Sequence, residues 1–259
     1  MDGAGKTMPV FDASELPNKL KKDAIAEALL EIRFESSDIE ELVVGRLGDI
    51  PNLKGFIASR LPTSDIPEVI RKGDPTLRYQ PTIEKRSVNN DRAARIGARV
   101  FSYHAYPPYP GWERYQGEIN ALIAAVFDKL SDLKVTRIGF RYINLLTKSD
   151  HLLNKLTDLE FSVAISNRPI VDDLSLSFTS DHSNSTVLTK IVSPNFVNLP
   201  PNQKTGLAGV VDIDVFTPQE YTAATAQEVI NWVDQAHTLE KKAFFSLIPV
   251  QVLEALKEE

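Results

Sequence analysis

Apolar and polar positions along this chain alternate between two periods, one typical of strands and one typical of helices. Residues 24–35 (AIAEALLEIRFE) end in a period of two, with apolar side chains separated by charged ones, which predicts a half-buried strand. Asp38 and Glu41 have the spacing of a capping box, so we expect a helix to begin here and to run to about Leu47.

Two more strands are expected before the first long helix, at residues 77–86 and 94–103. Residues 89–91 (NND) between them are typical of a hairpin loop. Residues 106–111 (YPPYPG) predict a stiff, polyproline-like linker. Residues 112–133 then repeat apolar side chains at helical spacing, which predicts a long amphipathic helix.

A further strand is expected after this helix, at residues 135–146. The second half of the chain is expected to be rich in strands, at 160–166, 174–180, 186–192 and 209–216. Thr217 and Glu220 have capping-box spacing with Pro218 between them, so a helix start is predicted there, with helical periodicity from about 223 to 245. Each half therefore has strands followed by one long helix.

This order of elements predicts an α+β fold with antiparallel sheets backed by two long helices. It also indicates a weak internal duplication of the strands-then-helix unit. We expect a loose N-terminal lead-in over residues 1–18, a first α+β half over 19–150 and a second half over 151–259, ending in its long helix.

Composition narrows the class of protein. Of 259 residues, 42% are hydrophobic and 25% are charged, which is ordinary for a globular chain with a sizeable core. The absence of cysteine excludes disulfides, thiolate nucleophiles and cysteine-ligated metals. No apolar run approaches the ~20 residues of a membrane span, and residues 1–25 lack the pattern of a secretory signal. We expect a cytoplasmic protein without a cofactor or a membrane contact.

Several motifs spread over nearly the whole chain resemble those of one prokaryotic family: EALLEIRF (27–34), GWERYQGEI (111–119), RIGFRYIN (137–144), DIDVF (212–216) and the spacing of Asp234, His237, Phe244 and Phe245. The chain resembles a sporadically distributed, functionally uncharacterised family of bacterial and archaeal proteins of roughly this length. It departs from that family at residues 20–24, where a proline-rich approach is common. The resemblance implies no activity; the patchy distribution implies carriage on mobile or defence-associated loci.

Three motifs resemble catalytic ones. Residues 3–7 (GAGKT) resemble the end of a phosphate-binding loop, but Pro9 blocks the helix that such a loop needs, so no nucleotide site is expected. His237 follows Asp234 by three residues, which is half of a general-base arrangement, and helix packing is the more ordinary interpretation.

Asp212 and Asp214 are the third motif. Two carboxylates on one face of a strand can bind Mg²⁺, so a metal-dependent nuclease or phosphotransferase is one alternative. Alternation on a half-exposed strand explains the same pattern without a metal.

A basic and aromatic stretch is the most informative cluster. Residues 78–142 hold eleven Lys or Arg against six Asp or Glu, although the whole chain has a net charge of −6. Arginine forks bind carboxylates and phosphates, and aromatic rings stack on partners. Our leading hypothesis is a non-enzymatic binding or regulatory protein that acts through protein–protein contacts, at a surface formed by Arg92, Arg95, Arg99, Arg137, Arg141, Tyr106 and Tyr109.

Two other interpretations of this cluster remain open. The arginines could pair with acidic residues of the same chain, and the rings could belong to the core. A non-catalytic nucleic-acid binder is the second, although the acidic total charge disfavours it.

Overall fold

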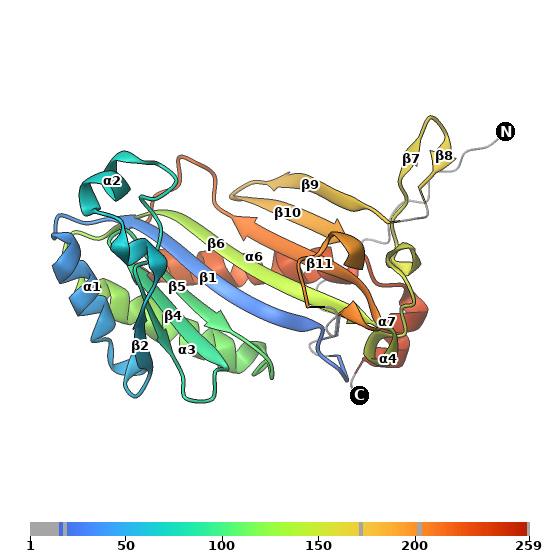
Figure 1. Ribbon diagram of the computed structural model, residues 1–259, viewed down its shortest axis with the longest axis horizontal. Helices are drawn as coiled ribbons and strands as arrows, with labels where there is room; N and C mark the ends of the chain where they lie inside the picture. Colours follow the sequence, from blue (N-terminus) through green and yellow to red (C-terminus); the bar gives the residue numbers. More distant parts are fainter. Residues whose placement is uncertain (1–15, 18–19, 171–172, 201–203, 258–259) are drawn as a thin grey trace.

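The computed structural model describes residues 16–17, 20–170, 173–200 and 204–257, so most of the expected lead-in over residues 1–18 lies outside the described residues. One nine-stranded sheet runs through the molecule in the order β2-β3-β4-β5-β1-β6-β11-β10-β9 (Figure 1). All neighbouring strands are antiparallel. The long helices α3 and α6 both lie behind this sheet, which confirms the α+β class.

The strands of the large sheet are β1 (Ile25–Glu35), β2 (Ile57–Arg60), β3 (Ile83–Arg86), β4 (Arg92–Gly97), β5 (Val100–Ala105), β6 (Lys134–Thr147), β9 (Ser175–His182), β10 (Ser185–Val192) and β11 (Leu207–Phe216). A separate small hairpin joins β7 (Ala164–Ile165) to β8 (Arg168–Pro169). The helices are α1 (Glu40–Gly48), α2 (Glu68–Gly73), α3 (Trp112–Lys129), α4 (Lys148–His151), α6 (Ala226–Phe245) and α7 (Val250–Leu256). Among the described residues, no helix is long and apolar enough to cross a membrane.

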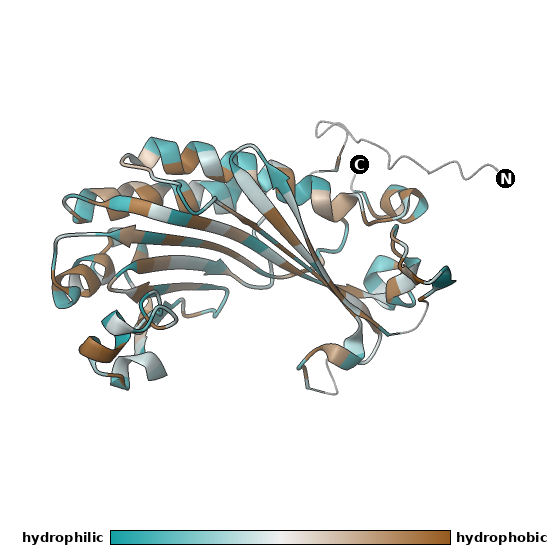
Figure 2. Cartoon of the chain, turned by 90° about the horizontal axis from the view of Figure 1, so that it is seen from above, coloured by the Kyte–Doolittle hydropathy of each residue, from teal (hydrophilic) through white to brown (hydrophobic). Residues whose placement is uncertain are grey.

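The two faces of the sheet differ chemically, as the alternate side chains of the central strands β1 and β6 show. Leu30, Ile32 and Phe34 of β1 are buried and point toward the helices, as does Phe140 of β6. The alternate positions point to the opposite side, which we call the open face; it carries Glu31 and Arg33 of β1 with Arg137 and Arg141 of β6. Figure 2 shows both long helices on one side of the sheet.

The two long helices cover the sheet because each has one apolar stripe. In α3 the stripe is Tyr115, Ile119, Leu122, Ile123 and Val126; in α6 it includes Val229, Trp232, Val233 and Ala236. These side chains and the inner faces of the strands form one continuous core.

The predicted start of the second long helix at Thr217 is wrong. Helix α6 begins at Ala226, where Thr225 and Glu228 form the capping box. Thr217 instead extends the sheet: its hydroxyl accepts a hydrogen bond from the backbone N–H of Ile138 at 3.0 Å, and its own N–H donates to the Ile138 carbonyl. Backbone pairing with β6 therefore wins over the local capping signal.

Three other local predictions also need correction. The single strand expected over residues 94–103 is the hairpin β4–β5, and only the last four residues of 77–86 form a strand. Strand β5 is buried at every position, so its apolar pattern hides the turn before it. Asp38 does not cap α1; its carboxylate is paired with Arg46 at 2.5 Å.

The strand order is similar, but not identical, on the two sides of the β1–β6 boundary. On one side lie β1, β5, β4, β3 and β2; on the other lie β6, β11, β10 and β9. In chain order, β1 is followed by four further strands of the sheet and then by α3, whereas β6 is followed by three and then by α6; both helices lie on the same face. The predicted internal duplication stays a prediction, and so does the division near residue 150.

Candidate functional site

The open face carries a hollow of about 330 Å³ over its central strands. Its lining comes from five strands and from the segment before β3: Leu29, Glu31, Arg33, Gln80, Pro81, Arg95, Val100, Ser102, His104, Arg137, Gly139, Arg141 and Asp214. Gly139 forms part of its floor. A Cβ atom there would lie 3.1 Å from Nη1 of Arg137 and 3.6 Å from Oδ1 of Asp214, so the missing side chain gives these groups room.

Arg141 is held by Asp212 across the β6–β11 pair. Its Nε and Nη2 atoms each donate a hydrogen bond of 2.7 Å to the two carboxylate oxygens. The bond to Asp212 raises the pKa of Arg141 despite its burial. Lys190 lies 3.9 Å from the same carboxylate. Asp212 is therefore engaged by two cations.

This pairing bears directly on the metal alternative. Asp214 lies beside Asp212 on the open face, and burial raises the pKa of its carboxyl group, which favours the protonated form. Within the described ranges, no group of three His, Cys, Asp or Glu side chains is placed to hold a metal ion. The structure thus gives the Asp212–Asp214 hypothesis no supporting ligand, and that hypothesis stays a prediction.

Arg137 is less completely neutralised than Arg141. Burial lowers the pKa of its guanidinium group, and the positive charge of Arg33 lowers it further. Its contact with a Glu31 oxygen is 3.3 Å, while Glu31 also accepts a 2.7 Å hydrogen bond from Arg33. The guanidinium also lies 5.1 Å from the centre of the Phe216 ring. Arg137 therefore shares one carboxylate with a second arginine.

Arg95 lies at the other side of the hollow and is paired within its own sheet. Its Nε donates to Glu84 at 2.8 Å, and Arg86 donates to the other oxygen of the same carboxylate at 2.9 Å. Tyr106 lies between them: its hydroxyl is 3.5 Å from Nη2 of Arg95, and Arg86 lies 5.1 Å from the centre of its ring. Arg95 and Tyr106 are thus brought together, as expected.

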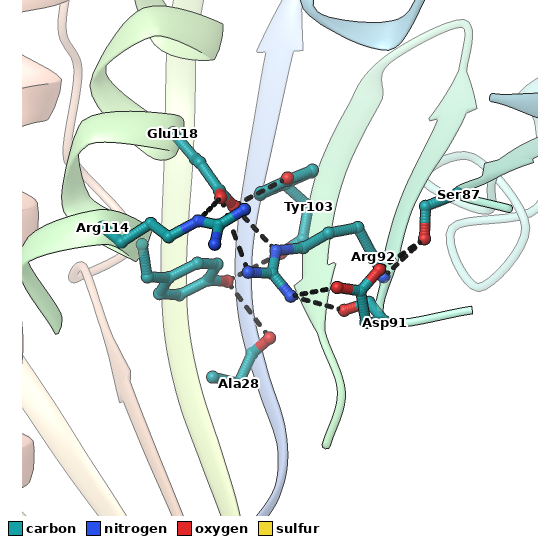
Figure 3. Close-up of polar contacts among 8 residues, drawn as sticks. Ala28, Ser87, Asp91, Arg92, Tyr103, Arg114 and Glu118 are labelled. Atoms are coloured by element: carbon teal, nitrogen blue, oxygen red, sulfur yellow. Dashed lines mark hydrogen bonds and ion pairs between the residues drawn. The ribbon is translucent and has the colours of Figure 1, made fainter. Parts of the chain in front are cut away.

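The structure separates the other expected site residues from the open face. Arg92 lies on the helix side, where it donates to Glu118 of α3 at 2.7 Å, and Glu118 also accepts from Tyr103 (Figure 3). Tyr109 is on the same side and hydrogen-bonds Tyr142, hydroxyl to hydroxyl, at 2.9 Å. The expected single surface is therefore divided between the two faces of the sheet.

Arg99 lies in the β4–β5 turn and pairs with Glu35 at the end of β1. The interpretation that arginines pair within the chain is correct for Arg92, Arg95, Arg99 and Arg141. Asp234 and His237 do not form the hydrogen-bonded pair of a general base and its orienting carboxylate. Asp234 accepts from Gln116 at 2.6 Å, and His237 stacks on Trp112.

A hydrogen-bonded row of Ser102, His104 and Glu27 lies at the edge of the hollow and was not predicted. The Ser102 hydroxyl is 2.9 Å from Nε2 of His104, and Nδ1 of His104 is 2.7 Å from a Glu27 oxygen. Burial alone would raise the pKa of Glu27, but the hydrogen bond with His104 holds it below its ordinary value. Glu27 is therefore a carboxylate, and Nδ1 is the donor.

One signal in the sequence could have found this row. Ser102 and His104 are two residues apart in an extended strand, so both side chains lie on the same face. Glu27 could not be added from the sequence, because the pairing of β1 with β5 decides which carboxylate is adjacent.

No protein-family model matches the sequence, and no curated protein matches it. The resemblance to the sporadically distributed prokaryotic family stays a prediction.

Proposed function

We propose that the protein is a non-enzymatic binding protein that recognises an acidic segment of a protein partner through the hollow on its open face. The observation that carries this proposal is a set of four arginines, Arg33, Arg95, Arg137 and Arg141, that line one hollow on the central strands. Each has a side chain about a third exposed, so each is ordered but still reachable.

The charge balance of the hollow favours an acidic ligand. Its lining includes two acidic residues, Glu31 and Asp214, against four arginines, and burial raises the pKa of Asp214. Arg137 has only a shared carboxylate partner. A carboxylate of a partner would give Arg137 the hydrogen-bond acceptors that the shared Glu31 carboxylate does not provide. An arginine guanidinium group can bind such a carboxylate through two parallel hydrogen bonds.

A direct test uses a labelled oligo-glutamate peptide, with binding followed by fluorescence anisotropy. Arg137→Gln should weaken binding roughly tenfold, about 1.4 kcal/mol, because the charged hydrogen bonds to the carboxylate are lost. Arg168→Gln, at an exposed position of β8, is the matched control and should bind as the unchanged protein does. Equal binding by both variants would remove the proposal.

The same assay separates a nucleic-acid partner from a protein partner. A labelled single-stranded oligonucleotide should bind more weakly than the peptide, and the peptide should compete with it. Tight oligonucleotide binding with a steep dependence on salt would support the nucleic-acid alternative instead.

The row of Ser102, His104 and Glu27 favours a second candidate function, hydrolysis of an acyl ester. The order hydroxyl, imidazole, carboxylate matches the nucleophile, base and orienting group of serine hydrolases. Ser102 Oγ would attack the acyl carbon while its proton passes to Nε2 of His104 and then to the leaving alcohol; water would release the acid. Arg95, the cross-strand partner of Ser102, would stabilise the oxyanion through the guanidinium nitrogens that Glu84 does not engage.

A fluorophosphonate probe tests this second function. Labelling that disappears in Ser102→Ala but persists in Ser177→Ala, an exposed serine on β9, would support it. Absence of labelling at Ser102 in the unchanged protein would remove it.

A further inference from the structure

A second, smaller cavity lies on the helix side of the sheet, away from the open face. It occupies about 70 Å³ between the start of β1, strand β6, the first turn of α3 and the last turns of α6. Several aromatic side chains and one buried carboxyl group form part of its lining: Tyr109, Trp112, Tyr142, Phe244, His237 and Glu240.

The aromatic walls are held in fixed positions. The hydroxyl groups of Tyr109 and Tyr142 are joined at 2.9 Å, and their rings meet edge to face. Trp112 and His237 stack with ring centres 3.7 Å apart and planes 4° apart. Such interlocked rings form the walls before any ligand arrives, so little ordering entropy would be lost on binding.

Glu240 is the unusual member of this lining. It is only 6% exposed, and its carboxyl group has no hydrogen bond or ion pair with any of the described residues. A buried carboxyl group without a partner is costly, and burial raises the pKa of Glu240 to about 8.

Other charged or titratable groups line the cavity beside Glu240. Asp23, just before β1, adds a second carboxylate to the lining, and Lys241 of α6 adds one cation whose pKa is lowered by burial. His237 is neutral at physiological pH because burial lowers its pKa to about 4. Asp23 and Lys241 each have an interaction of their own, so the cavity offers a ligand the Glu240 carboxyl group and a set of π faces.

We propose that this cavity binds a small alkylammonium group, with the Glu240 carboxylate as its counter-ion and the rings of Tyr109, Tyr142 and Trp112 as its cation–π walls. An ammonium ion would stabilise the ionised form of Glu240, which burial otherwise disfavours, and aromatic rings attract such cations. An anion would disfavour ionisation of Glu240 and would face the negative π faces of the rings, and a neutral apolar ligand would leave Glu240 unpaired.

The size of the cavity restricts the ligand. It has about half the volume of the ~150 Å³ apolar cavity that accepts benzene, which corresponds to roughly three to five heavy atoms. A methylated ammonium head group has this size. Since the cavity lies on the other side of the sheet from the four arginines, this inference is independent of the proposed function.

Tetramethylammonium is a suitable probe because its charge does not change with pH, and tert-butanol is a neutral molecule of similar shape. The chain has two tryptophans, so ¹⁵N indole resonances report on the site with an internal control. Titration should shift the indole signal of Trp112 and leave that of Trp232, which hydrogen-bonds Asn184, unchanged. Tert-butanol should give no saturating shift.

The matched variants are Glu240→Gln and Glu254→Gln, the latter exposed on α7. Glu240→Gln should weaken tetramethylammonium binding roughly tenfold or more, since the counter-ion is gone, while Glu254→Gln should have no effect. Unchanged affinity in Glu240→Gln, an equal response to tert-butanol, or a shift at Trp232 without one at Trp112 would each overturn the proposal. The indole titration of the unchanged protein decides the matter even if Glu240→Gln does not fold.

Discussion

Arg141 and Asp212 face each other across β6 and β11 and are joined by two hydrogen bonds of 2.7 Å each. The Asp212 side chain is 11% exposed, so its negative charge is stabilised by Arg141 more than by water. The pair joins the neighbouring strands β6 and β11 on the open face. It also fixes one of the four arginines of the hollow without removing it from solvent.

Replacement of Arg141 by Leu should therefore destabilise the fold by about 2 kcal/mol, because it leaves a largely buried carboxylate with only Lys190 nearby. Adding Asp212→Asn to this variant should recover part of the loss. Urea denaturation measures both. A double variant that is less stable than the sum of the two single variants would contradict this account.

Thr225→Ala should cost about 1 kcal/mol, because its hydroxyl caps the first turn of α6 by accepting from the Glu228 N–H. Thr238→Ala is the control within the same helix. Its hydroxyl donates only to the Asp234 carbonyl one turn back, so alanine should cost nothing there or add a little stability. Thermal unfolding of both variants shows whether the loss of stability comes from the missing cap or from any threonine-to-alanine change in this helix.

Gly139→Ala should weaken peptide binding at the open face while changing stability by less than about 1 kcal/mol. The new methyl group would meet Nη1 of Arg137 at 3.1 Å, so the guanidinium group must move within the hollow. Gly117→Ala on α3 has free space around it and should stabilise the helix by about 0.5–1 kcal/mol without affecting binding. Binding that survives Gly139→Ala unchanged would place the ligand elsewhere.

The pKa of Glu240 has a consequence for stability as a function of pH. Its folded value of about 8 lies above the value of 4.5 in the unfolded chain, so the folded state retains a proton that the unfolded state has lost between these limits. The free energy of unfolding should therefore fall by on the order of a few kcal/mol as pH rises from about 4.5 to 8. In Glu240→Gln this slope should disappear. Urea denaturation across this pH range checks it; parallel curves for both proteins would contradict it.

The elements that the sequence predicted well are those with one buried and one exposed face. Strand β1 and helices α3 and α6 each have a single apolar stripe, so their periods are visible. The β4–β5 hairpin was missed because β5 is buried on both sides. The start of α6 was misplaced because Thr217 pairs with a strand that lies far away in the sequence.

The candidate site shows the same limit. Arg92 and Arg95 are close in sequence, yet three residues along a strand place their side chains on opposite faces. The alternation of side chains along β4 is enough to predict that the two arginines lie on opposite faces. Only the packing of β4 shows which of those faces is buried. The contact between Arg141 and Asp212 joins positions 71 residues apart, and no local pattern specifies it. Residue types were predictable, whereas their partners required the sheet order.

The most direct test of the central claim is the anisotropy titration of the oligo-glutamate peptide with the unchanged protein, Arg137→Gln and Arg168→Gln. The open-face account predicts saturable binding that falls roughly tenfold in Arg137→Gln only. Indistinguishable titrations for the two variants, or no saturable binding to the unchanged protein, would contradict it.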